Sequence, residues 1–148
     1  MSINKILALD LGDAWTGIAI SDSTQMFARP MTTVGTKDLP PYLETLCRTE
    51  SITQIVIGHP RTMQGGESDQ TRKILTQKAQ LEKEFPNHEF ILWDERLSSQ
   101  RAQALAPKRR TPEEKLKIHA RAAAFILDSY LTFLRGKNDN EVINIDSL

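Results

Sequence analysis

Apolar residues in this chain of 148 residues gather in short runs and in helically spaced positions, and the two patterns predict different elements. Largely apolar runs predict strands over 5–10, 16–21, 52–57 and 89–94. Runs that are apolar on both faces are typical of strands inside a sheet. The first two strands are close enough to pair as a hairpin. A further strand is expected over 25–34, where Pro30 indicates an edge strand or a bulge.

Helical spacing predicts helices over 39–49, 68–85, 98–105 and 111–135. The last helix has the clearest start, because Thr111 can cap it, Pro112 suits its first turn and Glu114 completes a capping box. Gly136 is expected to end it, which leaves a flexible C-terminal tail over 137–148. Residues 1–136 should then form a single α/β domain with a mixed, mostly parallel five-stranded sheet and helices on both faces.

The composition is that of an ordinary globular protein, with 39% hydrophobic and 26% charged residues. No apolar run approaches the roughly 18 residues that cross a bilayer, and no signal-peptide pattern is visible, so we expect no membrane partner. Cys47 is the single cysteine, which argues against a disulfide framework or a cysteine-rich zinc site. A reducing cytoplasm is the expected location.

Charge is balanced over the whole chain but concentrated in one segment. The net charge of zero argues against a general polyanion binder. Between residues 96 and 121, however, eight basic residues face only Glu113 and Glu114: Arg96, Arg101, Lys108, Arg109, Arg110, Lys115, Lys117 and Arg121. This segment can either position a phosphate backbone or form an ordinary solvated helix face. The best candidates for nucleic-acid contacts are Arg96, Lys108, Arg109 and Arg110.

Two predicted central strands end on acidic residues, and these carboxylates are the main candidates for chemistry. Asp10 ends the first strand, and Asp94 and Glu95 end the last. Ligands of open α/β sheets collect at the carboxyl ends of strands, and carboxylates suit Mg²⁺ or Mn²⁺ in phosphodiester cleavage. Strand alternation allows only one of Asp94 and Glu95 to share a site with Asp10, and periodicity does not choose between them. The structural alternative is that Asp10 caps the turn at Gly12 and Glu95 pairs with Arg96.

An ordered set of motifs covers most of the chain up to Leu134. The set comprises Asp10-Leu11-Gly12, Thr16-Gly17-Ile18-Ala19-Ile20-Ser21-Asp22, Gly58-His59-Pro60, Asp94-Glu95-Arg96-Leu97-Ser98-Ser99, Ala122-Ala123, Ile126-Leu127 and Tyr130-Leu131. It resembles the YqgF family, also called the RuvX-type or Holliday junction resolvase family. The resemblance implies an RNase H-like fold and a cytoplasmic, metal-dependent nuclease that trims the 5′ end of precursor 16S ribosomal RNA. It also implies that Asp10 and Glu95 are the first and second catalytic acids.

The chain departs from the pattern of this family at two places. His119 stands where most relatives carry a third acid, and Ala14-Trp15 replaces a basic pair in the first hairpin turn. His119 lies on one helical stripe with Ala123 and Ile126 and is therefore expected to face the sheet. It is either a third site residue, as a neutral metal ligand or proton shuttle, or a half-buried structural histidine. Because imidazole suits Mn²⁺ or Zn²⁺ better than Mg²⁺, the site is either retuned or impaired.

These residues fit four functions to different degrees. A nuclease acting on structured RNA uses Asp10 and Glu95 to bind Mg²⁺ or Mn²⁺, with His119 completing the site. A resolvase of branched DNA requires a symmetric dimer, whereas the sequence shows no clear dimerisation stripe and predicts a monomer or weak homodimer. A catalytically weakened assembly factor would bind RNA in pre-ribosomal particles. An actin-like ATPase requires a second lobe, for which this chain is too short. Asp22 is expected to be a turn residue.

Overall fold

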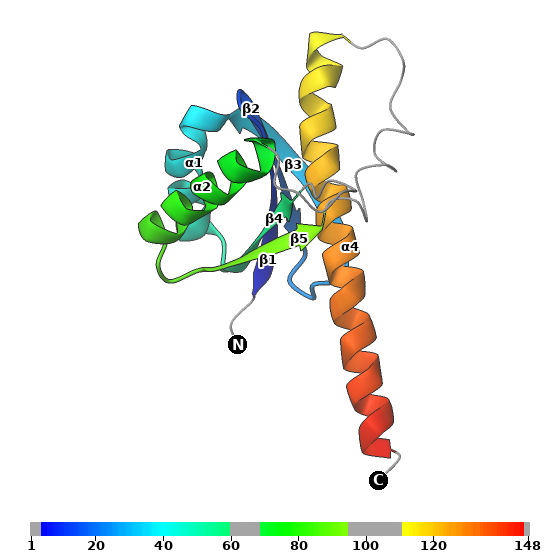
Figure 1. Cartoon of the computed structure of the whole chain (residues 1–148). Coiled ribbons are helices and arrows are strands. Elements are labelled where there is room, and N and C mark those ends of the chain that lie inside the picture. The colour runs from blue at the N-terminus through cyan, green and yellow to red at the C-terminus, as the bar shows by residue number, and fades with distance from the viewer. Residues whose placement is uncertain (1–3, 60–68, 95–110, 147–148) are drawn as a thin grey trace.

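A computed structural model describes residues 4–59, 69–94 and 111–146, with side chains described as far as Lys137. A single sheet runs through the middle of the molecule (Figure 1). Helices α1 and α2 cover one face of this sheet, and the long helix α4 crosses the other. The predicted arrangement of helices on both faces is therefore confirmed.

The sheet has five strands in the order β3-β2-β1-β4-β5. These strands are β1 (Lys5–Leu11), β2 (Trp15–Ser21), β3 (Ala28–Gly35), β4 (Ile52–His59) and β5 (Glu89–Asp94). The pairs β1–β2 and β2–β3 are antiparallel, whereas β1–β4 and β4–β5 are parallel. Of these five strands, β2 runs against the direction of the other four. The predicted mixed sheet and the hairpin at its start are both confirmed.

Strand β3 lies at one edge of the sheet, and its pairing with β2 contains a register shift. Ile18 pairs with Thr32 and Ala19 with Pro30, so that Met31 bulges between them. Proline lacks a backbone N–H and is tolerated at edges and bulges. Both alternatives expected for Pro30 therefore occur together.

The described helices are η1 (Thr36–Asp38), α1 (Leu39–Thr49), α2 (Asp69–Glu84) and α4 (Pro112–Asp146). Pro40 and Pro41 lie in the first turn of α1. The backbone N–H groups of a first turn have no partner within the helix, so proline costs no helical hydrogen bond there. The predicted limits of α1 and β5 match the observed ones. The helix expected over 98–105 and the cap expected at Ser68 lie outside the described residues. None of the described helices combines the length and apolar character that a bilayer span requires.

Side chains of β1 alternate between two hydrophobic cores. Leu7 and Leu9 join the core beneath α1 and α2, whereas Ile6 and Ala8 join the core beneath α4. All four side chains are almost completely buried, as predicted for a central strand. The alternation places Asp10 on the α4 side of the sheet.

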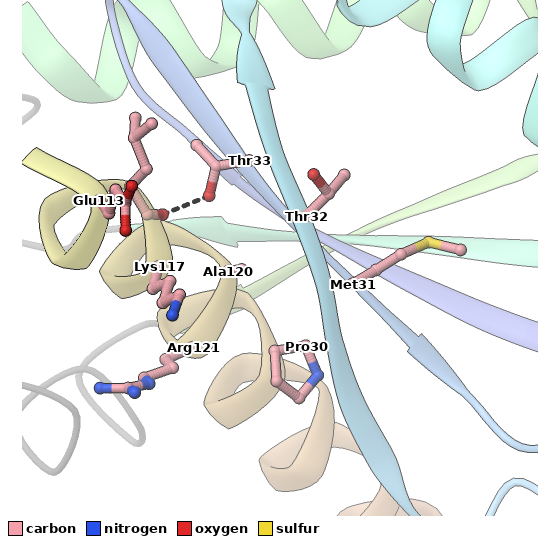
Figure 2. A pocket seen from close by; sticks show the side chains of 9 residues that line it. Pro30, Met31, Thr32, Thr33, Glu113, Lys117, Ala120 and Arg121 are labelled. Atoms are coloured by element: carbon pink, nitrogen blue, oxygen red, sulfur yellow. Dashed lines mark hydrogen bonds between the residues drawn. The ribbon is translucent and has the colours of Figure 1, made fainter.

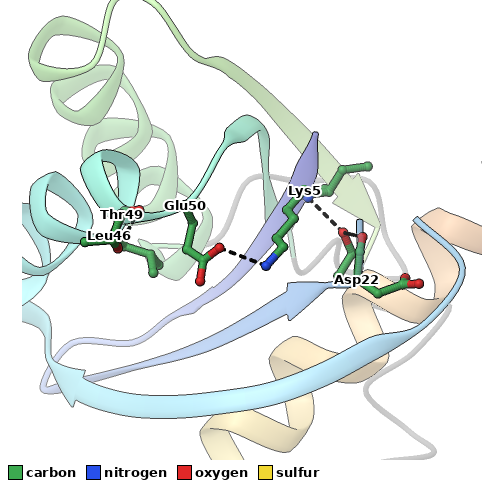
Figure 3. A network of polar contacts seen from close by, with 7 residues as sticks. Lys5, Asp22, Leu46, Thr49 and Glu50 are labelled. Carbon is green, nitrogen blue, oxygen red and sulfur yellow. Dashed lines mark hydrogen bonds and ion pairs between the residues drawn. The ribbon is translucent and has the colours of Figure 1, made fainter. Parts of the chain in front are cut away.

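Hydrogen bonds and an ion pair link the chain segments at the end of the sheet opposite Asp10 (Figure 3). The Lys5 ammonium donates to Glu50 Oε2 at 2.8 Å and joins the start of β1 to the end of α1. The Asp22 carboxylate accepts the backbone N–H groups of Phe27 and Met26, each at 2.9 Å, and the Thr24 hydroxyl. These hydrogen bonds, chiefly the one from Phe27, lower the pKa of Asp22 to about 2. Asp22 is thus a turn residue, as predicted.

Helix α4 begins as predicted but does not end as predicted. Thr111 N donates to Glu114 Oε2 at 3.0 Å and Glu114 N donates to Thr111 Oγ1 at 3.2 Å, which confirms the capping box. The expected end at Gly136 is wrong, because the helix continues to Asp146. Gly136 does not adopt the left-handed conformation of a C-cap, and a single helical glycine costs only about 1 kcal/mol. The backbone over 137–146 is accordingly helical, while the mobility of the tail stays a prediction.

Helix α4 comes unusually close to the sheet at Gly17 in β2. A Cβ atom built on Gly17 would lie 1.8 Å from the His119 carbonyl oxygen and 2.7 Å from Ala120 N. No atom of a side chain fits in this space, so glycine is required by the close approach of two backbones. Gly17 also pairs directly with Asp10 in the neighbouring strand. The same glycine therefore sets the distance between α4 and the carboxylate of Asp10.

We predict that Gly17→Ala destabilises the protein by more than the roughly 1–3 kcal/mol that is typical of overpacking, because the added methyl group collides with backbone rather than with a flexible side chain. Gly136→Ala is the matched control, since a Cβ there meets nothing within 4 Å. It should stabilise the helix by about 0.5–1 kcal/mol. Urea unfolding monitored by circular dichroism measures both changes. Equal midpoints for Gly17→Ala and the parent would contradict this packing.

Candidate active site

Asp10 lies at the carboxyl end of β1, on the face covered by α4. Its side chain is 20% exposed, so its carboxylate is accessible from one side while the strand beneath it is buried. The neighbouring turn is held by another residue, because Thr36 Oγ1 donates to the Gly12 carbonyl at 2.7 Å and Thr36 N donates to the Ala14 carbonyl at 2.9 Å. Within the described residues, Asp10 makes no hydrogen bond to this turn. The structural alternative for Asp10 therefore finds no support.

His119 reaches the site from the third turn of α4. Its Nδ1 atom lies 3.8 Å from Asp10 Oδ2, and its side chain is 36% exposed. This distance is too long for a hydrogen bond, and the described part of the chain provides no hydrogen-bond partner for the ring. Ala123 and Ile126, on the same stripe, are completely buried against the sheet. The prediction that His119 faces the sheet is confirmed, and its ring meets Asp10.

The end of β5 is fastened to α4 by Trp93. Trp93 Nε1 donates to Ser129 Oγ at 3.0 Å, and the ring packs edge-on against Tyr130 with centroids 5.3 Å apart. Trp93 belongs to the core beneath α4, whereas Phe90 belongs to the opposite core. Continuing this alternation places Asp94 on the α1 and α2 side of the sheet, away from Asp10. By this alternation, Asp94 belongs to the face of the sheet opposite to that of Asp10.

Several predicted site residues lie outside the described residues: Glu95, Arg96, Lys108, Arg109 and Arg110. Glu95 follows Asp94 directly in the sequence, and Asp94 pairs with His59 at the same edge of the sheet as Asp10. The roles of all five residues stay predictions. In the part of the chain that the structure describes, no three His, Cys, Asp or Glu side chains gather as a metal site.

Sequence reasoning gave no role to Gly17, which the structure places between Asp10 and His119. Its cross-strand partner is Asp10, and its α-carbon touches the His119 backbone. A glycine inside an apolar strand is a signal of close backbone approach, but it does not identify the partner. Gly17 is thus a positioning residue for the two side chains that meet at the end of β1.

Comparison with known proteins shows relatives across most of the chain. A protein of Rubrobacter xylanophilus named "Putative pre-16S rRNA nuclease" is 36% identical over 127 residues, which cover 86% of this chain and 91% of the relative. A protein of the same name from Clostridium botulinum is 37% identical over 136 residues, which cover 88% of this chain and 98% of the relative.

The fold and the family are also recognised. The structure of Thermus thermophilus RuvC in complex with a Holliday junction substrate matches with a TM-score of 0.55 and 12% identity, covering 89% of this chain and 96% of that one. This likeness shows a shared RNase H-like α/β fold. Residues 4–133 match the family model described as RuvX, Holliday junction resolvase. The chain therefore belongs to the RuvX family, as its motifs led us to expect.

Proposed function

We propose that this protein is a metal-dependent nuclease that hydrolyses phosphodiester bonds during 5′-end processing of precursor 16S ribosomal RNA, in the cytoplasm. Membership of the RuvX family and the names of its relatives support this proposal. The observation that carries it is the approach of His119 Nδ1 to Asp10 Oδ2, 3.8 Å apart at the carboxyl end of a central strand. Ligands of open α/β sheets bind at this edge.

The donor atoms at this edge fit a divalent cation. Two ligands of one ion can be at most roughly 4.2 Å apart, which is twice a metal–ligand bond of about 2.1 Å. The 3.8 Å between Asp10 and His119 lies within this limit, and both side chains are partly accessible. When bound, a divalent cation supplies charge neutralisation at the phosphodiester and activation of a water molecule. Asp10 and His119, with Glu95 as a proposed third ligand, would hold it.

The side chains of the site have different proposed roles. Asp10 contributes a negative charge at a fixed position, because its strand is buried on both faces and α4 is held at Gly17. His119 contributes a neutral nitrogen ligand. Arg96, Lys108, Arg109 and Arg110 are proposed to bind phosphates and hold the substrate without reading its sequence.

His119 is proposed to retune the site rather than to inactivate it. Replacing a carboxylate with imidazole removes one negative charge, which weakens the binding of hard Mg²⁺. A nitrogen ligand is better tolerated by Mn²⁺ or Zn²⁺. The position of the His119 ring, 3.8 Å from the Asp10 carboxylate, supports a ligand role.

Cleavage of branched DNA is a second candidate, because the matching family model is described as a Holliday junction resolvase. Cutting two opposed strands of a junction requires a symmetric dimer. RNA processing has no such requirement and suits a monomer or weak homodimer. Light scattering at working concentration separates the two candidates, because a strict monomer excludes paired junction cleavage.

We predict that Asp10→Asn lowers cleavage of precursor 16S RNA by at least about 100-fold, because an amide oxygen is a far weaker cation ligand than a carboxylate. A labelled RNA spanning the 5′ processing site, incubated with Mn²⁺ or Mg²⁺, measures this loss. Asp13→Asn is the matched control, since Asp13 lies in the nearby turn and pairs at the surface with Lys73 at 3.4 Å. Unchanged cleavage by Asp10→Asn would refute the assignment. Absence of cleavage by the parent with either metal would favour an RNA-binding assembly factor.

We predict that His119→Asp raises the affinity for Mg²⁺ and lowers the preference for Mn²⁺, because it restores a hard oxygen ligand and one negative charge. Calorimetric titration with each metal measures the affinities directly, and Mg²⁺-dependent cleavage should rise in parallel. His119→Asn serves as the control that changes the ring without adding charge. If His119→Asp leaves both metal affinities unchanged, His119 is not a ligand.

A further inference from the structure

A groove of about 530 Å³ lies between the edge strand β3 and helix α4 (Figure 2). Thr33 Oγ1 donates to the Leu116 carbonyl and ties the strand to the helix at its floor. Apolar atoms of Pro30, Leu116 and Ala120 line the groove. The interior of the groove is therefore mainly apolar, although it opens on a charged helix face.

The groove and the Asp10 site lie at the same level of the sheet. Asp10 pairs with Gly17, and Gly17 pairs in turn with Thr33, so one row of residues crosses three strands. Two strand spacings of about 4.8 Å put roughly 10 Å between the ends of this row. Helix α4 passes over its middle residue, where the His119 backbone meets Gly17. Because α4 lies on the sheet between these two places, the direct route from one to the other passes over the exposed face of α4.

That exposed face presents two cations. Lys117 and Arg121 project from successive turns of α4, and in Figure 2 Lys117 lies nearer to β3 while Arg121 extends away from it. Among the described residues, neither has an ion-pair partner within 4 Å. Glu113, one turn before Lys117, adds one negative charge next to these two cations. The three side chains together therefore carry a net positive charge. Cations that point in different directions suit successive charges of an extended polyanion better than one small anion.

We propose that the groove binds a single-stranded segment of the RNA substrate, which crosses α4 from the Asp10–His119 site. Lys117 and Arg121 bind its phosphates, and the apolar wall at Pro30 and Ala120 receives an unstacked base. A duplex keeps its bases stacked inside the helix. Only a single strand therefore offers both phosphates and an exposed base face to the same groove. This inference rests on the proposed function and adds to it the form of the substrate next to the cleavage site.

The test compares two labelled RNA duplexes, one blunt and one with a single-stranded extension, by fluorescence anisotropy. All proteins carry Asp10→Asn so that binding is measured without cleavage. Lys117→Ala combined with Arg121→Ala should weaken binding of the extended RNA several-fold and bring its affinity close to that of the blunt RNA. The salt dependence of log K should become shallower by about 1.4, which is the loss of two single-strand phosphate contacts. Arg72→Ala with Lys83→Ala on α2 is the matched control, because it removes the same charges from exposed positions on the opposite face.

An extended RNA that carries 4-thiouridine near the junction provides a second measurement. Photochemical cross-links should map to residues 30–33 or 116–121. Equal weakening of both RNAs by the paired alanine substitutions, or cross-links confined to other segments, would overturn the proposal. Failure of the proposed function has a different signature: the protein with Asp10 intact would not cleave RNA, while the binding results would still report on the groove.

Discussion

The contact between the backbone of α4 and Gly17 is the constraint on which the site depends. Because glycine has no side chain, the helix can lie directly on β2, with the His119 carbonyl in the space that a Cβ would otherwise fill. Gly17 pairs with Asp10 on one side and with Thr33 on the other. The height of α4 above this row decides both how far His119 stands from Asp10 and how open the β3–α4 groove is.

The two cores give this contact its rigidity. Leu7 and Leu9 pack β1 from one side, and Ala8 packs it from the other, so that Asp10 extends from a strand buried on both faces. Helix α4 is packed against the sheet over residues 123–127 by Ala123, Ile126 and Leu127, all completely buried. Close-packed interiors of this kind resist small displacements, which is what a ligand set requires of its support. The apolar packing of β1 and α4 therefore determines where the polar atoms of the site lie.

Local patterns in the sequence predicted much of the fold. The prolines at the start of α1, the capping box at Thr111 and the apolar run of β1 each specify an element through short-range chemistry. The end of α4 was predicted wrongly, because a glycine is a weak helix breaker when no left-handed cap forms. The orientation of His119 was predicted correctly from the helical stripe that it shares with Ala123. The roles of Glu95 and of the basic residues that follow it stay predictions.

Non-local features were beyond sequence reasoning. The approach of Gly17 to α4 joins residues a hundred positions apart, and the groove exists only where β3 and α4 meet. The face of the sheet to which Asp94 belongs also follows only from the two cores against which β5 packs, whereas the assignment of Glu95 rests on the family resemblance and stays a prediction. Each of these features depends on how helices and strands pack against one another rather than on the sequence of any one element. Family membership supplied the expected chemistry, and the packing shows which side chains can reach one another.

The proposed activity depends most on Asp10 and His119 holding one divalent ion between them. A crystal of the protein soaked in Mn²⁺ and measured by anomalous X-ray scattering tests this directly. We expect an anomalous peak within bonding distance of both Asp10 Oδ2 and His119 Nδ1. A peak next to other residues, or no peak at a Mn²⁺ concentration that supports cleavage, would contradict shared metal binding by Asp10 and His119.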